Sequence, residues 1–217
     1  DLVGPERMTV AFQVINRNPA LPVVVHAPHG GTVIPDEERA AFLLDDAALA
    51  DEIRLMTDHR TDRLAEAAAD LGAAAFVNRL SRLVVDPERF PDEREEMEAA
   101  GMGFAYTATS RGGPLRHLAS ADRARLKERW FDPYAAALAQ LVGAVRERFG
   151  RCVIVDLHSY PRRALPYEQR PEAPRPEVCI GTDAFHTPDW LAAGVEEACD
   201  RLGLGHGRDT PFRGCYV

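Results

Sequence analysis

The sequence has few cysteines, no long apolar run and no excess of basic residues. Its four cysteines are widely spaced and form no CxxC pair, which argues against a thiolate zinc ribbon. No stretch has the length or apolarity of a membrane span or a secretory signal. The net charge of -8 argues against a surface for nucleic acid or an anionic membrane. These absences predict a reduced, soluble, cytoplasmic protein with neither kind of partner.

The order of apolar and polar segments predicts an α/β fold. We expect one domain over residues 1–217, with a mostly parallel or mixed central sheet and helices on both faces. Pro133 is expected to kink or break a helix. Strands are expected at residues 22–27, 73–77, 83–85, 152–158 and 177–181, and helices at residues 45–71, 121–149 and 188–202. Between them we expect a lead-in at residues 1–20, an irregular segment at 88–118 and a loop at 159–176.

Two of the expected strands end at histidines. The apolar run from Cys152 stops at His158, and the run from Pro22 leads to His29. Polar residues at the carboxyl ends of strands mark the usual place of a site in an open α/β sheet. Two such strands could deliver two imidazoles to one metal ion. The alternative for His29 is a tight turn with an incidental histidine, and His26, inside its strand, is expected to be a satisfied core histidine.

Further candidates flank these histidines. Asp156 could orient an imidazole and fix its tautomer, and Ser159 could donate a hydrogen bond to a ligand or a carboxylate. A serine nucleophile is disfavoured because the sequence has no GxSxG elbow. Gly30 and Gly31, directly after His29, would let the backbone approach a ligand closely.

Two aspartates and three arginines could each belong to a functional site or lie at the solvated surface. On one helix, Asp58 and Asp62 would share a face, a weak hint of a cation, although the spacing alone favours a solvated face. Arg82, Arg89 and Arg213 lie beside Gly, Pro or strand ends. A guanidinium can bind a carboxylate through two hydrogen bonds, and the alternative is a surface ion pair.

The ordered set of motifs resembles the N-formylglutamate amidohydrolase family from about residue 21 to the end. Each motif is short, and the series together is fairly specific. The matching stretches are Ala27-Pro28-His29-Gly30-Gly31 with Ile34-Pro35, Thr57-Asp58 through Asp62-Arg63-Leu64, Leu71-Gly72-Ala73, Ser81-Arg82-Leu83-Val84-Val85-Asp86, Asp132-Pro133-Tyr134, Asp156-Leu157-His158-Ser159, Ile180-Gly181-Thr182 and Pro211-Phe212-Arg213-Gly214.

The resemblance implies a phosphorylase/hydrolase-like fold related to zinc carboxypeptidases, and hydrolysis of an N-acyl amide on an acidic amino acid. It implies His29 and His158 as metal ligands, Asp62 as the carboxylate ligand with Asp58 as the alternative, and Arg82 and Arg89 facing the substrate's carboxylates. Such a set leaves an open position for water on zinc, although manganese or cobalt would also suit these ligands.

The sequence departs from the family's pattern in three places. Glu88 stands where relatives have Asn, and a carboxylate there would repel an anionic substrate unless Arg89 neutralises it. Ala135 stands where relatives often have His. Relatives also continue into a strand with a glutamate resembling the carboxypeptidase general base, whereas this sequence ends at Val217. Either the sequence is shorter than the natural chain, or another carboxylate serves as base, or activity is lost, and we expect the first.

Three functions follow as hypotheses. The first is a zinc amidohydrolase acting on N-formyl-L-glutamate or a close N-acyl amino acid. The second is a related peptidase or deacylase that cuts γ-glutamyl or N-acetylaspartyl bonds, motivated by Glu88 and Ala135. The third is a catalytically silent protein that keeps the pocket for a small anionic ligand. The oligomeric state is not predicted.

Overall fold

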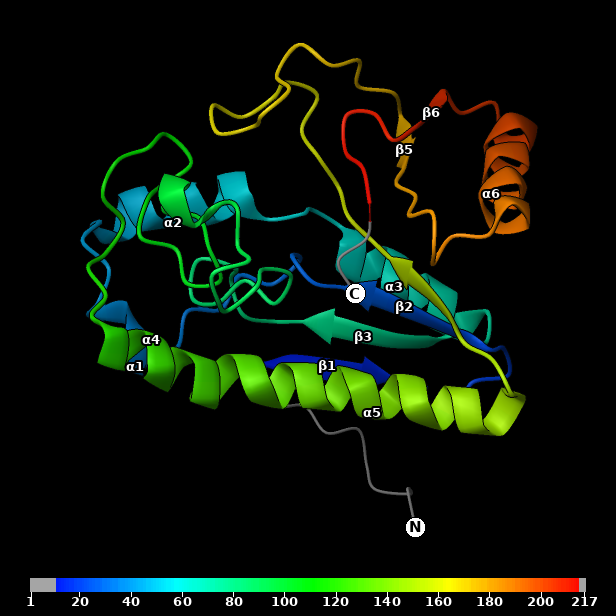
Figure 1. The fold of residues 1–217 in the computed structure, drawn as a ribbon, viewed down its shortest axis with the longest axis horizontal. Helices are drawn as coiled ribbons and strands as arrows, with labels where there is room; N and C mark the ends of the chain where they lie inside the picture. Colours follow the sequence, from blue (N-terminus) through cyan, green and yellow to red (C-terminus); the bar gives the residue numbers. More distant parts are fainter. Residues whose placement is uncertain (1–10, 215–217) are drawn as a thin grey trace. The chain divides into compact units, whose positions relative to one another are not determined.

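The computed structural model describes residues 11–214, which form two compact units (Figure 1). The first unit ends at Tyr160 and the second begins at Pro161. The predicted organisation of residues 1–217 as one domain stays a prediction. Within residues 11–214, no helix combines the length and the apolarity that crossing a membrane requires.

The first unit is built on a mixed four-stranded sheet with the strand order β1-β3-β2-β4. β2 pairs in parallel with β3 and with β4, whereas β1 is antiparallel to β3. The predicted α/β fold with a mixed central sheet is therefore confirmed. The strands are β1 (Phe12–Ile15), β2 (Val23–Ala27), β3 (Ala74–Asn78) and β4 (Val153–Asp156).

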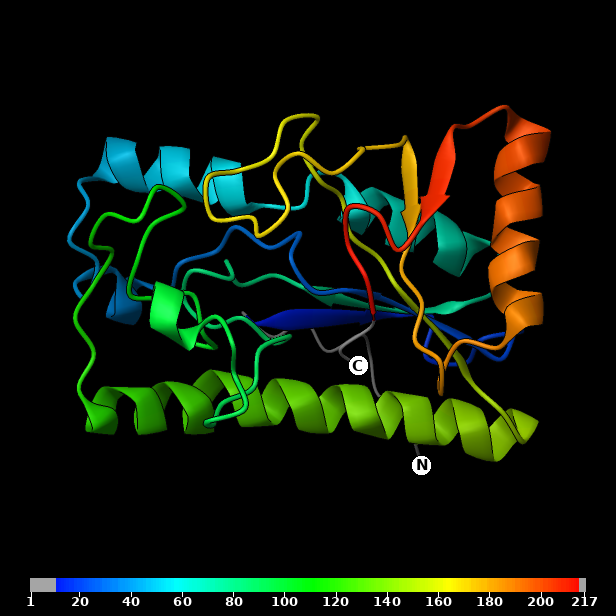
Figure 2. The same ribbon diagram turned by 45° about the horizontal axis from the view of Figure 1, so that its top comes forward.

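Helices cover both faces of this sheet, as Figure 2 shows with α5 on one side and α3 on the other. Alternate residues of a strand point to opposite faces, so β2 and β3 need apolar cover on both. Val25 and Val77 pack with Ala65 and Ala69 of α3 on one face. The helices of this unit are α1 (Asp36–Arg39), α2 (Asp46–Met56), α3 (Thr61–Asp70), a 3-10 turn (Glu98–Ala100), α4 (Ser120–Leu126), a π-helical turn (Lys127–Phe131) and α5 (Asp132–Phe149).

The second unit is a small βαβ arrangement. β5 (Val178–Ile180) pairs in parallel with β6 (His206–Arg208), and α6 (Asp189–Leu202) connects them. A helical crossover is the usual connection between adjacent parallel strands. The strand expected at residues 177–181 and the helix expected at 188–202 are confirmed, whereas β6 was not predicted.

Two predictions about the first unit are wrong. The helix expected over residues 45–71 is two helices, because Thr57 is extended and Arg60 adopts a left-handed φ of 67°. Residues 83–85 form no strand: a backbone hydrogen bond from Val84 to Ser81 closes a turn there, and the three apolar side chains are buried within it. The lead-in also contains β1, which was not predicted.

Pro133 interrupts its helix in a particular way. The helical segment continues from Ser120 to Phe149, but the turn over residues 127–131, just before the proline, is π-helical. A proline lacks the N–H of the regular ladder and its ring crowds the preceding turn, which a wider turn relieves. The expected interruption is therefore a π-helical turn within a continuous segment.

Candidate metal centre

The two histidines at the strand ends meet at one edge of the sheet. His29 lies two residues after the end of β2, and His158 lies two residues after the end of β4. β2 and β4 are parallel neighbours, so their carboxyl ends reach the same edge. The Nδ1 atoms of His29 and His158 are 3.3 Å apart. The sequence-based expectation that these imidazoles lie together agrees with this geometry.

Asp58 reaches the same edge from the break between α2 and α3. Its backbone N–H donates to the carbonyl of His29 at 3.0 Å. Its own carbonyl accepts from the Thr61 hydroxyl at 2.9 Å, which fixes the turn that begins α3. Because the helix begins at Thr61, Asp58 is not part of it and does not share a helix face with Asp62. Asp58 is buried, and its carboxylate points at the two imidazoles.

The three donor atoms have the spacing of ligands around one small cation. Asp58 Oδ2 is 2.9 Å from Nδ1 of His158 and 3.8 Å from Nδ1 of His29, and the two nitrogens are 3.3 Å apart. Ligands at roughly 2.0–2.1 Å from a tetrahedral zinc ion are about 3.3 Å from each other. The average separation of the three atoms therefore fits a zinc-sized ion.

The hydrogen bond made by Nε2 of His29 leaves the lone pair on Nδ1, which faces the other two donor atoms. Nε2 of His29 is 2.8 Å from Asp86 Oδ1, which is an acceptor, so Nε2 carries the hydrogen. In the neutral ring Nδ1 then has the free lone pair. Asp86 is itself held by Arg82 at 2.7 and 3.1 Å and by the Tyr106 hydroxyl at 2.8 Å. This carboxylate–histidine pair has the form that usually supports a metal ligand.

The Nε2 atom of His158 also faces carboxyl groups. It lies 3.2 Å from Glu88 Oε2 and 3.5 Å from Asp156 Oδ2, while Nδ1 meets Asp58 Oδ2 at 2.9 Å. Asp58 is further fixed by the backbone N–H of Ser159, at 3.2 Å from Oδ2. Asp156 therefore faces an imidazole, as the sequence suggested, whereas Ser159 acts through its backbone.

The electrostatics favour a cation where these three atoms meet. Burial, which is the larger cause, and the charge of Arg82 lower the pKa of His29, so its ring stays neutral to a lower pH than a free imidazole. Burial alone would raise the pKa of Asp58, but the hydrogen bond from His158 and the charge of His29 outweigh it. Burial also opposes ionisation of Asp86, yet Arg82 and His29 hold its pKa well below its usual range. The site thus presents a neutral imidazole at His29 next to ionised carboxylates. Burial alone would lower the pKa of His158, but Glu88, Asp156 and Asp58 raise it well above its usual value, so a bound zinc ion would replace the hydrogen on Nδ1 of this ring.

A second group of potential ligands lies behind the first, and two of its members, His26 and Asp156, are joined by a hydrogen bond. It consists of His26, Glu88 and Asp156. His26 is buried, with Nδ1 2.9 Å from Asp156 Oδ1 and Nε2 2.6 Å from the Tyr134 hydroxyl. Burial, with Asp156 nearby, raises the pKa of Glu88 to about 8. His26 is satisfied by its neighbours, as the sequence predicted.

Asp62 lies apart from the three donor atoms. It stands in the first turn of α3 and belongs to neither of the two groups of potential ligands found within residues 11–214. The geometry therefore favours Asp58 over Asp62 as the carboxylate ligand.

The three arginines occupy different environments. Arg82 is buried, and two of its nitrogens donate to the Asp86 carboxylate. The side chain of Arg89 is 28% exposed, and its Nε, which is buried, has no hydrogen-bond partner. Arg213 is exposed and belongs to the second unit. Of Arg82 and Arg89, both in the first unit, Arg89 is the one with a buried N–H that has no acceptor.

The two glycines after His29 allow a close approach to the chain's own atoms. A Cβ on Gly31 would lie 2.3 Å from the carbonyl oxygen of Leu80. A Cβ on Gly30 would lie 2.6 Å from the hydroxyl oxygen of Thr61. Contact of these glycines with a substrate stays a prediction.

Sequence reasoning assigned no role to Asp86, Tyr106 or Tyr134, although the first and last lie in motifs that carried the resemblance. Asp86 could have been found by the rule that identified His158, since it directly follows an apolar run. No local pattern marks Tyr106, which lies within the irregular segment and reaches Asp86 only through the fold.

Comparisons with known proteins agree on one family. The family model for N-formylglutamate amidohydrolase matches residues 21–217. An N-formylglutamate deformylase of Pseudomonas aeruginosa is 28% identical over 203 residues, which cover 91% of this chain and 73% of the relative. One of Pseudomonas putida is 28% identical over 204 residues with the same coverage of 91% and 73%.

Solved structures share the fold. An N-formylglutamate amidohydrolase from Ralstonia eutropha JMP134 superposes with a TM-score of 0.82 at 25% identity, covering 95% of this chain and 79% of that one. A gene product of Agrobacterium tumefaciens gives a TM-score of 0.67 at 21% identity, with coverage of 94% and 74%. The second likeness concerns the fold alone.

Proposed function

The chain belongs to the N-formylglutamate amidohydrolase family, and we propose that it hydrolyses the N-formyl amide bond of N-formyl-L-glutamate or a close N-acyl amino acid. A zinc ion held by His29, Asp58 and His158 is part of this proposal. The observation that carries it is the convergence of two imidazole Nδ1 atoms and one carboxylate oxygen at 2.9–3.8 Å from one another. The names of the two Pseudomonas relatives support the substrate.

The roles of the residues follow from which side of the imidazoles they face. A bound divalent ion would supply an activated water and polarisation of the scissile carbonyl. Asp58 balances the ion's charge from the Nδ1 side. Asp86 faces Nε2 of His29. Glu88 and Asp156 face Nε2 of His158. We therefore assign Asp86, Glu88 and Asp156 to orienting the histidine ligands, rather than to taking a proton from water.

Arg89 is our candidate for binding a carboxylate of the substrate. Its Nε lacks a hydrogen-bond partner and lies 3.9 Å from Asp86 Oδ2, and its Nη1 lies 3.7 Å from Glu95 Oε1. A buried N–H without an acceptor is unfavourable until a ligand provides one. A substrate carboxylate can accept from a guanidinium with two parallel hydrogen bonds.

The departures from the family's pattern at Glu88 and Ala135 do not argue against a formyl substrate. Glu88 is buried on the Nε2 side of both imidazoles, 3.6 Å from that of His29 and 3.2 Å from that of His158. Ala135 is exposed on α5, next to the buried Tyr134. Neither position supports a changed substrate preference, so the formyl compound is favoured over γ-glutamyl or N-acetylaspartyl compounds.

Formate release from N-formyl-L-glutamate tests the proposal. The purified protein would be assayed as isolated, after chelation and after return of zinc, beside N-acetyl-L-aspartate and a γ-glutamyl dipeptide. We expect release that chelation abolishes, that zinc restores and that His158→Ala removes. Preference for another compound would refute the substrate assignment, and absence of release from zinc-loaded protein would favour a silent binding protein.

A further inference from the structure

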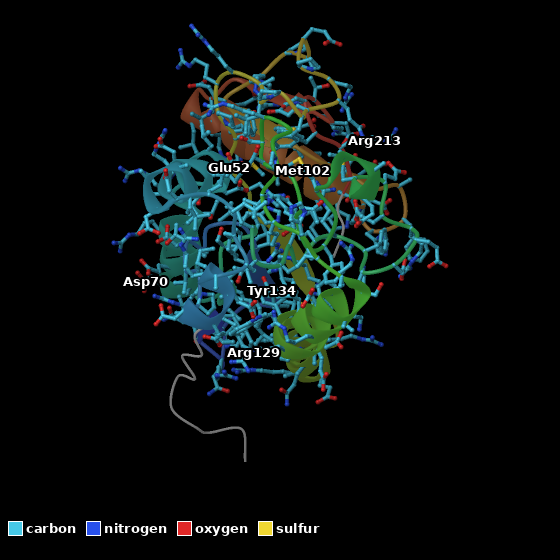
Figure 3. All side chains as sticks on the ribbon, turned by 90° about the vertical axis from the view of Figure 1, so that its left-hand side faces the viewer. Glu52, Asp70, Met102, Arg129, Tyr134 and Arg213 are labelled. Carbon is cyan, nitrogen blue, oxygen red and sulfur yellow. The ribbon has the colours of Figure 1, made fainter. Side chains whose placement is uncertain are left out.

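A buried row of polar groups continues from His158 into the sheet and ends at Tyr134. Tyr134 extends from α5 into the interior of the first unit (Figure 3) and is 4% exposed, and His26 on β2 is 1% exposed. The Tyr134 hydroxyl is 2.6 Å from Nε2 of His26, and Nδ1 of His26 is 2.9 Å from Asp156 Oδ1. Neither Tyr134 nor His26 belongs to the three proposed ligands.

The direction of each hydrogen bond in this row follows from the acceptors. The ionised Asp156 can only accept, so Nδ1 of His26 carries the hydrogen of that bond. Nε2 of a neutral His26 then offers a lone pair, and the Tyr134 hydroxyl is the donor that meets it. The hydrogens therefore point from Tyr134 through His26 to Asp156.

The sheet and the aromatic packing fix these positions. His26 lies opposite Asp156 in the parallel pairing of β2 with β4, and opposite Phe76 in the pairing of β2 with β3. The ring of Tyr134 packs edge-on against Phe76, with centroids 4.9 Å apart at 90°, and against Phe12 at 5.8 Å and 87°. The hydroxyl of Tyr134 therefore has little freedom to leave His26.

The Asp156 carboxylate connects His26 with His158. With Oδ1 bound to His26, Asp156 presents Oδ2 to Nε2 of His158 at 3.5 Å, beside Glu88 at 3.2 Å. A hydrogen bond at Nε2 fixes the tautomer that leaves Nδ1 free for a metal. Without its bond to His26, the Asp156 carboxylate would lose one of the contacts that fix its orientation.

We propose that His26 and Tyr134 are positioning residues for His158, acting through Asp156 to hold its Nδ1 toward the metal. This inference rests on the proposed zinc site. It gives His26 and the Pro133-Tyr134 motif a part in metal binding, although neither residue contacts the ligand position.

The test measures zinc affinity by competition with a chromophoric chelator, together with the zinc stoichiometry and the thermal midpoint of the metal-free protein. Tyr134→Phe removes one oxygen and keeps the ring packed against Phe12 and Phe76. His26→Asn is the second variant, in case the first effect is small. Loss of an outer partner of a metal-bound histidine typically weakens metal binding 10–100-fold. We expect about 10-fold for His26→Asn and roughly 3-fold for Tyr134→Phe, one step further out.

Ser110→Ala is the matched control. Like Tyr134→Phe, it removes one buried hydroxyl; this one donates to the Glu52 carboxylate at 3.1 Å, outside the hydrogen-bonded network of the site. We expect it to lower the thermal midpoint and to leave zinc affinity unchanged, which separates positioning from general destabilisation.

The outcomes distinguish this inference from the function on which it rests. Unchanged zinc affinity in both variants, while His158→Ala loses zinc, would overturn the positioning role and leave the proposed site intact. No zinc binding by the parent protein would overturn both. Two zinc ions per chain, one of them lost in His26→Asn, would overturn the positioning role in favour of a second metal site.

Discussion

Replacing Asp58 by asparagine should remove metal binding while the fold is kept. Asparagine has the shape of aspartate, and its carbonyl oxygen can still accept the Ser159 N–H that Asp58 accepts at 3.2 Å. What disappears is the negative charge 2.9 Å from Nδ1 of His158 and 3.8 Å from that of His29. The variant therefore separates the charge of the ligand from its place in the turn.

The expected loss of zinc affinity can be bounded from the usual effect of losing a partner at a metal site. Loss of an outer partner weakens metal binding about 10–100-fold, so loss of a direct carboxylate ligand should cost about 100-fold or more. That factor corresponds to about 2.7 kcal/mol of binding free energy. Formate release at limiting zinc should fall in proportion to the zinc-bound fraction.

Asp62→Asn is the matched control, because the same change is made at the other aspartate that the sequence offered. We expect it to change zinc affinity less than 2-fold, as Asp62 lies in the first turn of α3, outside the ligand group. Chelator competition and the formate assay would be run on both variants. If Asp62→Asn lost zinc and Asp58→Asn kept it, the assignment of the carboxylate ligand would be refuted.

Three further predictions concern the backbone, the pH dependence and the substrate. Gly31→Ala should destabilise the protein by about 3 kcal/mol in urea unfolding, because the added Cβ would lie 2.3 Å from the Leu80 carbonyl oxygen. Gly143→Ala on α5 is the control: its Cβ would meet open space, so it should stabilise the protein by about 0.5–1 kcal/mol. Equal effects of the two substitutions would contradict this prediction. Because burial raises the pKa of Glu88 from 4.5 to about 8, the native metal-free protein keeps a proton that the unfolded chain releases, and its stability should fall between these pH values by at most about 1.4 kcal/mol per pH unit. Glu88→Gln should flatten that slope in denaturation series, and an unaltered slope would assign it to other groups. Arg89→Met should raise KM for N-formyl-L-glutamate about 10–100-fold with unchanged zinc affinity, and an unchanged KM would exclude Arg89 from binding the substrate's carboxylate.

The sequence predicted the strands that carry the site because their signal is local. The apolar runs before His29 and before His158 are short, strongly apolar and bounded by glycine or proline, and both form strands at nearly the expected residues. That both histidines meet follows from a general rule about strand ends, which needs no knowledge of the remaining chain.

The break after α2 could not be predicted from periodicity, since the amphipathic pattern runs through it. What ends α2 is an extended Thr57 and a left-handed Arg60, and both are stabilised by contacts of Asp58 and Thr61 with the His29 loop. Asp62 was the expected ligand because the resemblance to the family implied it, with Asp58 as the alternative. The tertiary contact, rather than the local propensity, selects Asp58.

The buried network behind the ligands is likewise a property of the fold. His26 lies 130 positions before Asp156 in the sequence, and the two become neighbours only through the pairing of β2 with β4. Tyr106 reaches Asp86 from the irregular segment. No spacing within a single element encodes such pairs, so they could not be predicted from one sequence.

The π-helical turn before Pro133 makes the number of residues in this helix matter as much as their identity. A π turn holds one residue more than an α turn, so removing one residue from 127–131 would restore a regular helix and rotate α5 by about 100° relative to α4. Upstream of the turn, Arg125 on α4 donates to Glu38 at 2.7 Å, and downstream Tyr134 donates to His26. A regular helix could keep only one of these two contacts. A single-residue deletion in this turn should therefore be far more damaging than any conservative substitution there, and related chains that lack the extra residue should anchor this helix differently.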